Sequence, residues 1–153
     1  MTALLYKQLR LVCHPMTPVF CLFGIMVLIP NYPYTIIFFY VMLGLFFTFL
    51  NIREQKDIYY SAILPVPKRD TVKAGCVLVT LVELLSLAVL APCALLAVRL
   101  QPGKDNLVGM DPNLALFAAG FLMYAVFNAV FLTAFYRSGY KVGAAYLKAN
   151  LAL

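Results

Sequence analysis

A single acidic residue, Glu83, interrupts the long apolar run of residues 72–100. A charged side chain near the centre of an apolar helix costs about 2.5–3.5 kcal/mol on membrane-insertion scales, so it normally faces a cavity or a polar partner. Glu83 therefore either hydrogen-bonds to a neighbouring helix and fixes packing, through Asn128, Thr80 or Ser86, or lies on the pathway of a substrate or ion. Asn128, inside another apolar run, allows the same two interpretations.

A second group of candidate residues lies in the most polar stretch of the chain, residues 53–73. The segment between Glu54 and Leu64 predicts a short amphipathic helix that Pro65 and Pro67 would stop. Such a helix either docks onto a soluble partner or lies flat on the lipid surface with its tyrosines among the head groups, and the residues alone leave both open. The candidate docking side chains are Asp57, Ile58, Tyr59, Tyr60, Lys68 and Arg69.

Catalytic patterns are missing from the sequence. The single histidine, His14, has no partnered nucleophile or acid pattern, and neither an HExxH zinc motif nor a GxxxxGK[ST] phosphate-binding loop occurs. We therefore expect no enzyme activity, no metal, no cofactor, and no ATP bound by this chain. The cysteines form no CxxC pair and predict small buried apolar side chains: Cys13, Cys21, Cys76 and Cys93.

The composition indicates the solvent of the chain. Of its 153 residues, 64% are hydrophobic and 12% are charged, and a soluble domain usually carries about twice that charge. Too few charges are present to cover a water-soluble globule, so a lipid bilayer must surround much of the protein. The net charge of +6 is not arranged as a basic stripe with exposed aromatics, so we expect no nucleic-acid partner.

The apolar runs predict an all-α integral membrane protein with one membrane domain. An N-terminal interfacial helix is expected over 2–13, with Lys7, Arg10 and the adjacent His14 on one helical face; the alternative is an N-terminal extension of the first crossing. The first crossing is the weakest pattern, because Pro15 and Pro18 precede a short run and predict a kink. The expected crossings are residues 14–30, 34–52, 72–100 and 114–136, with a cytoplasmic loop at 53–71 and a cytoplasmic tail at 137–153.

The distribution of positive charge predicts the orientation. With the N-terminus inside, two basic residues, Arg99 and Lys104, lie outside, and ten lie inside. This asymmetry follows the positive-inside rule and places both termini in the cytoplasm. The ten are Lys7, Arg10, Arg53, Lys56, Lys68, Arg69, Lys73, Arg137, Lys141 and Lys148.

Four segments resemble the small bacterial permeases of the type 2 ATP-binding-cassette (ABC-2) family. They are IPNYP at 29–33, KDIYYSAILPVPKRDTVKA at 56–74, NLVGMDPNLALF at 106–117 and FNAVFLTAFYRSGYKVG at 127–143. The resemblance implies a bacterial cytoplasmic membrane, a separate ABC-type ATPase that binds the ATP, and a second permease subunit, expected as a homodimer. It also implies that the 53–71 loop contains a coupling helix docked on that ATPase, and that the N-terminal helix is an elbow helix.

The resemblance further implies six crossings, and this chain ends about ten residues after its GYKVG match, so the last two crossings of the family are expected to be lacking. The resulting hypothesis is a permease subunit of an ABC exporter that works by alternating access. The alternative is a non-transporting membrane subunit with a regulatory or assembly role.

Overall fold

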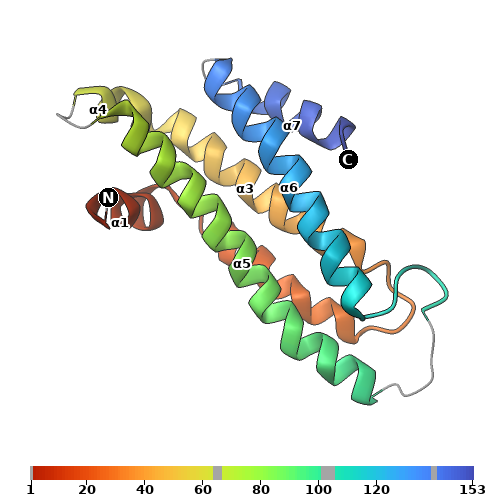
Figure 1. Cartoon of the computed structure of the whole chain (residues 1–153). Coiled ribbons are helices and arrows are strands. Elements are labelled where there is room, and N and C mark those ends of the chain that lie inside the picture. Colours follow the sequence, from red (N-terminus) through yellow and green to blue (C-terminus); the bar gives the residue numbers. More distant parts are fainter. Residues whose placement is uncertain (1, 64–66, 101–105, 139–140) are drawn as a thin grey trace.

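The computed structural model describes residues 2–63, 67–100, 106–138 and 141–153, and these form helices and turns with no strand among them. The predicted all-α fold is therefore confirmed (Figure 1). The order is α1 (Thr2–Lys7), the π-helical turn η1 (Gln8–Val12), α2 (Met16–Cys21), the 3₁₀ helix η2 (Leu22–Leu28), α3 (Thr35–Glu54), α4 (Asp57–Ile63), α5 (Lys68–Leu100), α6 (Leu114–Arg137) and α7 (Val142–Leu151).

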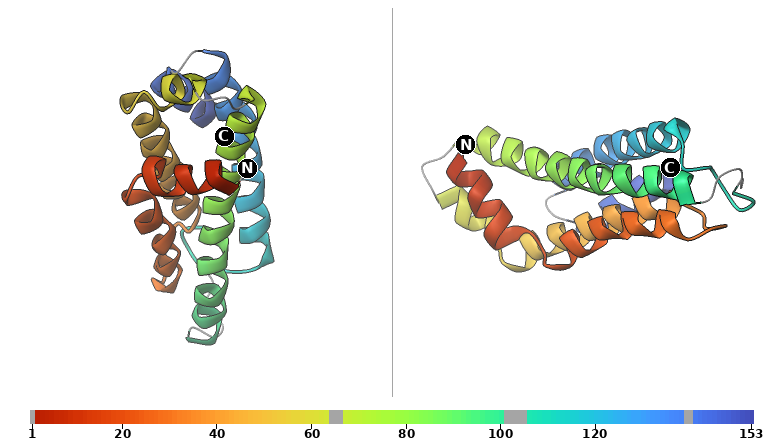
Figure 2. Two further views of the ribbon diagram at one scale, coloured as in Figure 1. Left: turned by 90° about the vertical axis from the view of Figure 1, so that its left-hand side faces the viewer. Right: turned by 90° about the horizontal axis from the view of Figure 1, so that it is seen from below.

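Three helices, α3, α5 and α6, are long and apolar enough to cross a membrane. A fourth candidate is a bent pair, Leu4–Val12 and Met16–Leu28, whose two halves meet at 86°. The bend shows that the N-terminal helix is not a straight extension of the first crossing. Figure 2 shows α1 lying across the other helices at the end of the bundle where α4 lies.

The break between the two halves falls at Pro15, because a residue before proline is disfavoured in the helical conformation. Helix α3 satisfies the backbone groups that the break leaves open. Asn51 Nδ2 donates to the main-chain oxygen of Val12 at 3.0 Å, and the His14 amide donates to Thr48 Oγ1 at 3.3 Å. Beyond the break, α2 and η2 together span roughly 23 Å at their usual rises, so the 3₁₀ turns lengthen this candidate crossing.

Aromatic rings form the contact between α3 and α6. Phe49 packs edge-to-face on Phe131 and Phe135, with ring centroids 5.0 and 4.8 Å apart. Farther along the same contact, Phe38 lies directly against Gly120, where α6 carries no side chain. All of these rings are buried, so α3 lies at the centre of the apolar core between the first crossing and α6.

Hydrogen bonds join the turn between η2 and α3 to the segment before α6. Asn106 Nδ2 donates to the Tyr32 main-chain oxygen at 2.8 Å, and the Leu107 amide donates to Asn31 Oδ1 at 3.4 Å. The turn that joins η2 to α3 and the segment before α6 therefore lie on the same side of the bundle. The α3–α4 turn and the start of α5 lie at the opposite end (Figure 1).

The C-terminal segment differs from a simple tail. Residues 142–151 form α7, which turns back and packs on α6 and α3. The Tyr146 ring lies 4.7 Å from the Phe46 ring and 6.1 Å from the Phe127 ring, both inside long apolar helices. The buried residues of α7, Val142, Ala145 and Ala149, are small and share one face of the helix, which permits this close packing. The segment is so short that its hydrophobic periodicity in the sequence did not predict that it packs on α6 and α3.

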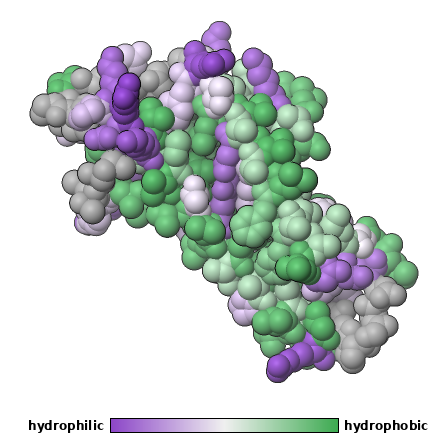
Figure 3. Space-filling view, viewed as in Figure 1, coloured by the Kyte–Doolittle hydropathy of each residue, from purple (hydrophilic) through white to green (hydrophobic). Residues whose placement is uncertain are grey.

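The outer surface matches a bilayer environment. In Figure 3 the middle of the molecule is covered by hydrophobic residues, and hydrophilic residues gather toward the two ends. A narrow hydrophilic strip interrupts the hydrophobic face where α5 and α6 run side by side. The chain is therefore a multi-pass membrane protein, and on the face in view its hydrophilic residues lie toward the two ends and in this strip.

Candidate functional site

Helix α4 presents large apolar side chains to the exterior. It begins three residues later than the sequence predicts, because α3 continues to Glu54 and Lys56 adopts a left-handed conformation with φ of 51°. This turn lets α4 leave the line of α3. The side chains of Tyr59, Tyr60 and Ile63 are 69%, 60% and 84% exposed.

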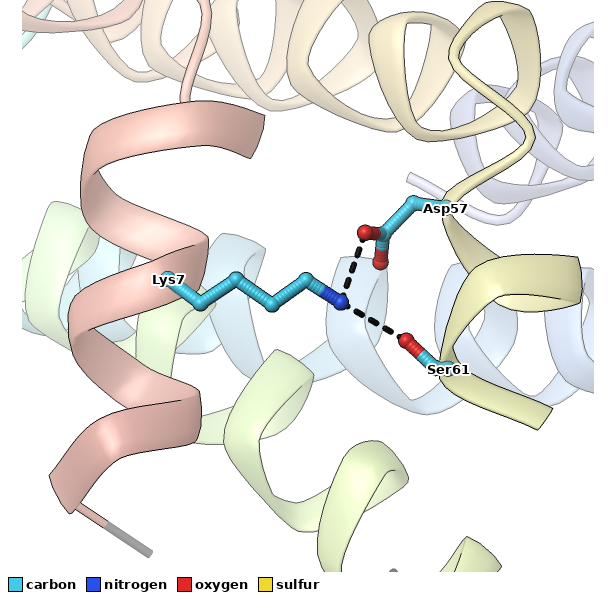
Figure 4. A network of polar contacts seen from close by, with 3 residues as sticks. All are labelled: Lys7, Asp57 and Ser61. Atoms are coloured by element: carbon cyan, nitrogen blue, oxygen red, sulfur yellow. Dashed lines mark hydrogen bonds and ion pairs between the residues drawn. The ribbon is translucent and has the colours of Figure 1, made fainter. Parts of the chain in front are cut away.

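The opposite face of α4 is fixed by a lysine from the N-terminal helix (Figure 4). Lys7 Nζ lies 2.7 Å from Asp57 Oδ1 and donates to Ser61 Oγ at 2.7 Å. It also lies 5.4 Å from the centre of the Tyr60 ring, within the range of a cation–π contact. Asp57 and Ser61 are 8% and 6% exposed, so this contact decides which face of α4 remains outside.

The structure divides the predicted docking residues into two groups. Tyr59, Tyr60, Lys68 and Arg69 are exposed at the same end of the molecule, whereas Asp57 is buried against Lys7. Asp57 therefore fixes α4 to the N-terminal helix and does not lie on the outer face of α4. The side chain of Ile58 and the whole of residues 64–66, including Pro65, lie outside the described residues.

Sequence reasoning missed Lys7 and Ser61 as members of this site. The spacing of Lys7, Arg10 and His14 indicated a shared polar face, which explains an interfacial helix without any partner. In the structure Lys7 turns to α4 while the His14 ring packs on Phe47 at 5.7 Å. No specific signal for this pair is present in the sequence, because Asp57 directly follows Lys56 in a loop that carries several other cations.

We expect Lys7→Met to lower the stability of the protein in detergent by on the order of 3 kcal/mol, because it leaves the Asp57 carboxylate buried without its cation. The double variant Lys7→Met with Asp57→Asn should recover part of the loss. Thermal unfolding of the four proteins of this double-mutant cycle measures the coupling. The exposed Arg10→Met serves as the control on the same helix, and equal losses in Lys7→Met and Arg10→Met would contradict the ion pair.

A second polar group lies between α5 and α6. Glu83, 6% exposed, accepts a hydrogen bond from Asn128 Nδ2 through Oε2 at 2.9 Å. One helical turn away, the Ser86 and Tyr124 hydroxyls lie 2.8 Å apart. Asn128 is the interhelical partner that the sequence allowed for Glu83, while Thr80 bonds within α5 to the Cys76 main-chain oxygen.

Metal and thiol chemistry find no support in the described part of the chain. No group of three or more His, Cys, Asp or Glu side chains converges there in a way that could hold a metal ion. The four cysteines are free, and burial raises the pKa of the Cys13 thiol at the end of the N-terminal helix, which leaves it less reactive. The two polar groups, around α4 and around Glu83, are thus the candidate functional sites.

The comparisons with known proteins agree with this architecture. A family model described as "ABC-2 family transporter protein" matches residues 3–149, which include every helix from α1 to most of α7. No match is found among curated proteins, and none among solved structures.

Proposed function

The chain belongs to the ABC-2 family of transporter proteins, and from this membership we propose that it is the membrane-spanning permease subunit of an exporter driven by a separate ATPase. The observation that supports an ATPase partner is the exposed apolar face of α4. Two tyrosines and an isoleucine, Tyr59, Tyr60 and Ile63, stand exposed on a helix whose other face is held by a buried ion pair. Aromatic side chains in the centre of a small patch usually dominate binding, and this patch suits a groove on a soluble protein.

In the proposed mechanism α4 transmits conformational changes of the ATPase to the membrane helices. Helix α3 leads into α4, and Lys7 ties α4 to the N-terminal helix. A displacement of α4 by the ATPase would therefore move both the first crossing and α3. Two permeases, expected as a homodimer, would re-pack in response to ATP binding and hydrolysis by two ATPase subunits, which alternately open the pathway to each side. This chain itself would bind neither ATP nor a cofactor.

The exposed charges beside α4 support the same partner. Lys68 and Arg69 are exposed in the first turn of α5, at the same end of the molecule as the tyrosines. Basic side chains at the rim of an interface mainly steer the encounter and set the orientation. The rival arrangement places Tyr59 and Tyr60 among lipid head groups, in a non-transporting regulatory or assembly subunit. Co-purification of an ABC-type ATPase with the chain separates the two, because the rival gives no such partner.

We also propose that α4 and both termini lie in the cytoplasm of a bacterial cell, at the inner membrane. The excess of Lys and Arg at the end of the bundle that holds α4 supports this orientation. Single cysteines replace Leu107, 86% exposed at the far end, and Tyr59, in a background lacking the native four. An impermeant thiol reagent added to intact cells should label the first and spare the second until the cells are opened. Labelling in the reverse order would refute the orientation. Lys104, a predicted outer residue, lies outside the described residues.

A further inference from the structure

The contact between α5 and α6 contains an isolated charge. Within the apolar stretches of the described helices, residues 16–28, 35–52, 74–98 and 114–136, Glu83 is the only charged side chain. It has no Lys or Arg partner among the described residues, and its hydrogen bond from Asn128 supplies no full positive charge. A carboxylate in apolar surroundings without a cation is strongly unfavourable.

The hydrogen-bond inventory identifies what is missing at this contact. Glu83 Oε1 and Asn128 Oδ1 are both buried, and neither accepts a hydrogen bond from any described residue. Both atoms are acceptors, since a carboxylate has no proton and the Asn128 amide already directs Nδ2 to Glu83 Oε2. Two unmatched acceptors on adjacent side chains call for a donor that binds between the helices.

The nearby hydroxyl groups cannot supply that donor. Ser86 Oγ donates its one proton to the Glu83 main-chain oxygen at 2.7 Å. The Tyr124 hydroxyl, 2.8 Å from Ser86 Oγ, must then donate to Ser86, because the serine proton is already committed. Both hydroxyl protons are therefore used away from Glu83 Oε1 and Asn128 Oδ1.

We propose that Glu83 and Asn128 form an intramembrane binding site for one positively charged hydrogen-bond donor, supplied either as a proton on the carboxyl group or as the protonated amine of a ligand. One positive charge neutralises Glu83, and its N–H or O–H hydrogen satisfies the unmatched oxygens. We do not assign a metal ion to this site, because no group of three or more His, Cys, Asp or Glu side chains converges there among the described residues.

The site differs from the ATPase contact and can be tested on the purified chain alone. Binding to Glu83 needs no ATPase, so failure of this test leaves the proposed docking of α4 intact, and the reverse also holds. The protein is placed in lipid nanodiscs as wild type, Glu83→Gln and, as a matched carboxyl control, Glu54→Gln. Glu54 is exposed in the last turn of α3.

Infrared difference spectra report the state of the Glu83 carboxyl group. If a proton is the donor, a carboxylic-acid band is present in wild type and in Glu54→Gln and is lost in Glu83→Gln. If an amine is the donor, hexylammonium shifts the Glu83 carboxylate band, whereas tetraethylammonium, which has no N–H group, does not. Calorimetry should then show hexylammonium binding at least tenfold weaker in Glu83→Gln. An ionised Glu83 whose band responds to neither cation would overturn the proposal.

A second variant protects the test if Glu83→Gln does not fold. Asn128→Leu keeps Glu83 but removes the amide that holds it and one of the two unmatched oxygens. The carboxylic-acid band should shift in this variant if a proton is bound, or hexylammonium affinity should fall several-fold if an amine is bound. Spectra and affinity identical to wild type would show that Asn128 is not part of a binding site.

Discussion

Replacing Gly120 with valine is expected to prevent α6 from packing against α3, and replacing it with alanine is expected to weaken that contact. A Cβ atom at residue 120 would lie 2.5 Å from two carbon atoms of the Phe38 ring, a separation that requires one of them to move. The ring has little freedom to move, because Phe38 is buried and packs edge-to-face on Tyr124 at 5.6 Å. Overpacking of a close-packed core typically costs about 1–3 kcal/mol, and valine adds two more methyl groups.

The chain offers a matched control for this substitution. Gly143 is also helical, and a Cβ atom there would meet nothing within 4 Å. Alanine is favoured over glycine in a helix by about 1 kcal/mol, so Gly143→Ala should be neutral or stabilising. Thermal unfolding in detergent should therefore rank the proteins as Gly143→Ala, then wild type, Gly120→Ala and Gly120→Val. A Gly120→Val protein as stable as wild type would show that α3 and α6 do not approach as closely as the structure places them.

The double variant Tyr59→Ala with Tyr60→Ala is expected to abolish recovery of the ATPase subunit while leaving the membrane domain folded. Loss of aromatic hot-spot residues costs on the order of 2 kcal/mol or more, which is at least about a thirtyfold loss of affinity. Both rings are largely exposed on α4, so their removal opens no large cavity in the core. Pull-down of the ATPase at equal levels of membrane protein measures the effect.

Two controls distinguish docking from a general loss of surface hydrophobicity. Leu107→Ala with Val108→Ala removes two exposed apolar side chains at the opposite end of the bundle and should leave ATPase recovery unchanged. The single variants add a finer distinction, because Tyr60 also lies over Lys7, whereas Tyr59 has no such contact in the described structure. Tyr59→Ala should therefore affect docking alone. Full ATPase recovery by the double variant would favour tyrosines that lie among lipid head groups.

The sequence by itself determined the class of the protein and the approximate limits of its helices. Long apolar runs indicate that lipid surrounds the chain, and in lipid a helix forms all of its own backbone hydrogen bonds. For this reason the runs at 34–52 and 114–136 predicted α3 and α6 to within two residues at each end. Pro15 and Pro18 marked the kink for the same local reason, since proline removes a backbone donor and restricts its neighbour. The resemblance to the ABC-2 family was also visible in the sequence, because it lies in four short segments and in their order along the chain.

The tertiary structure decided which polar side chains meet. Nothing in the spacing of Lys7 and Asp57, fifty residues apart, shows that the N-terminal helix folds across α4, because that contact depends on the 86° bend and on the turn at Lys56. The pairing of Glu83 with Asn128 depends likewise on the register of α5 against α6, in which the Ser86 and Tyr124 hydroxyls also lie 2.8 Å apart. Periodicity along one helix reports the face that is buried, but the partner on that face is fixed only when the helices pack together.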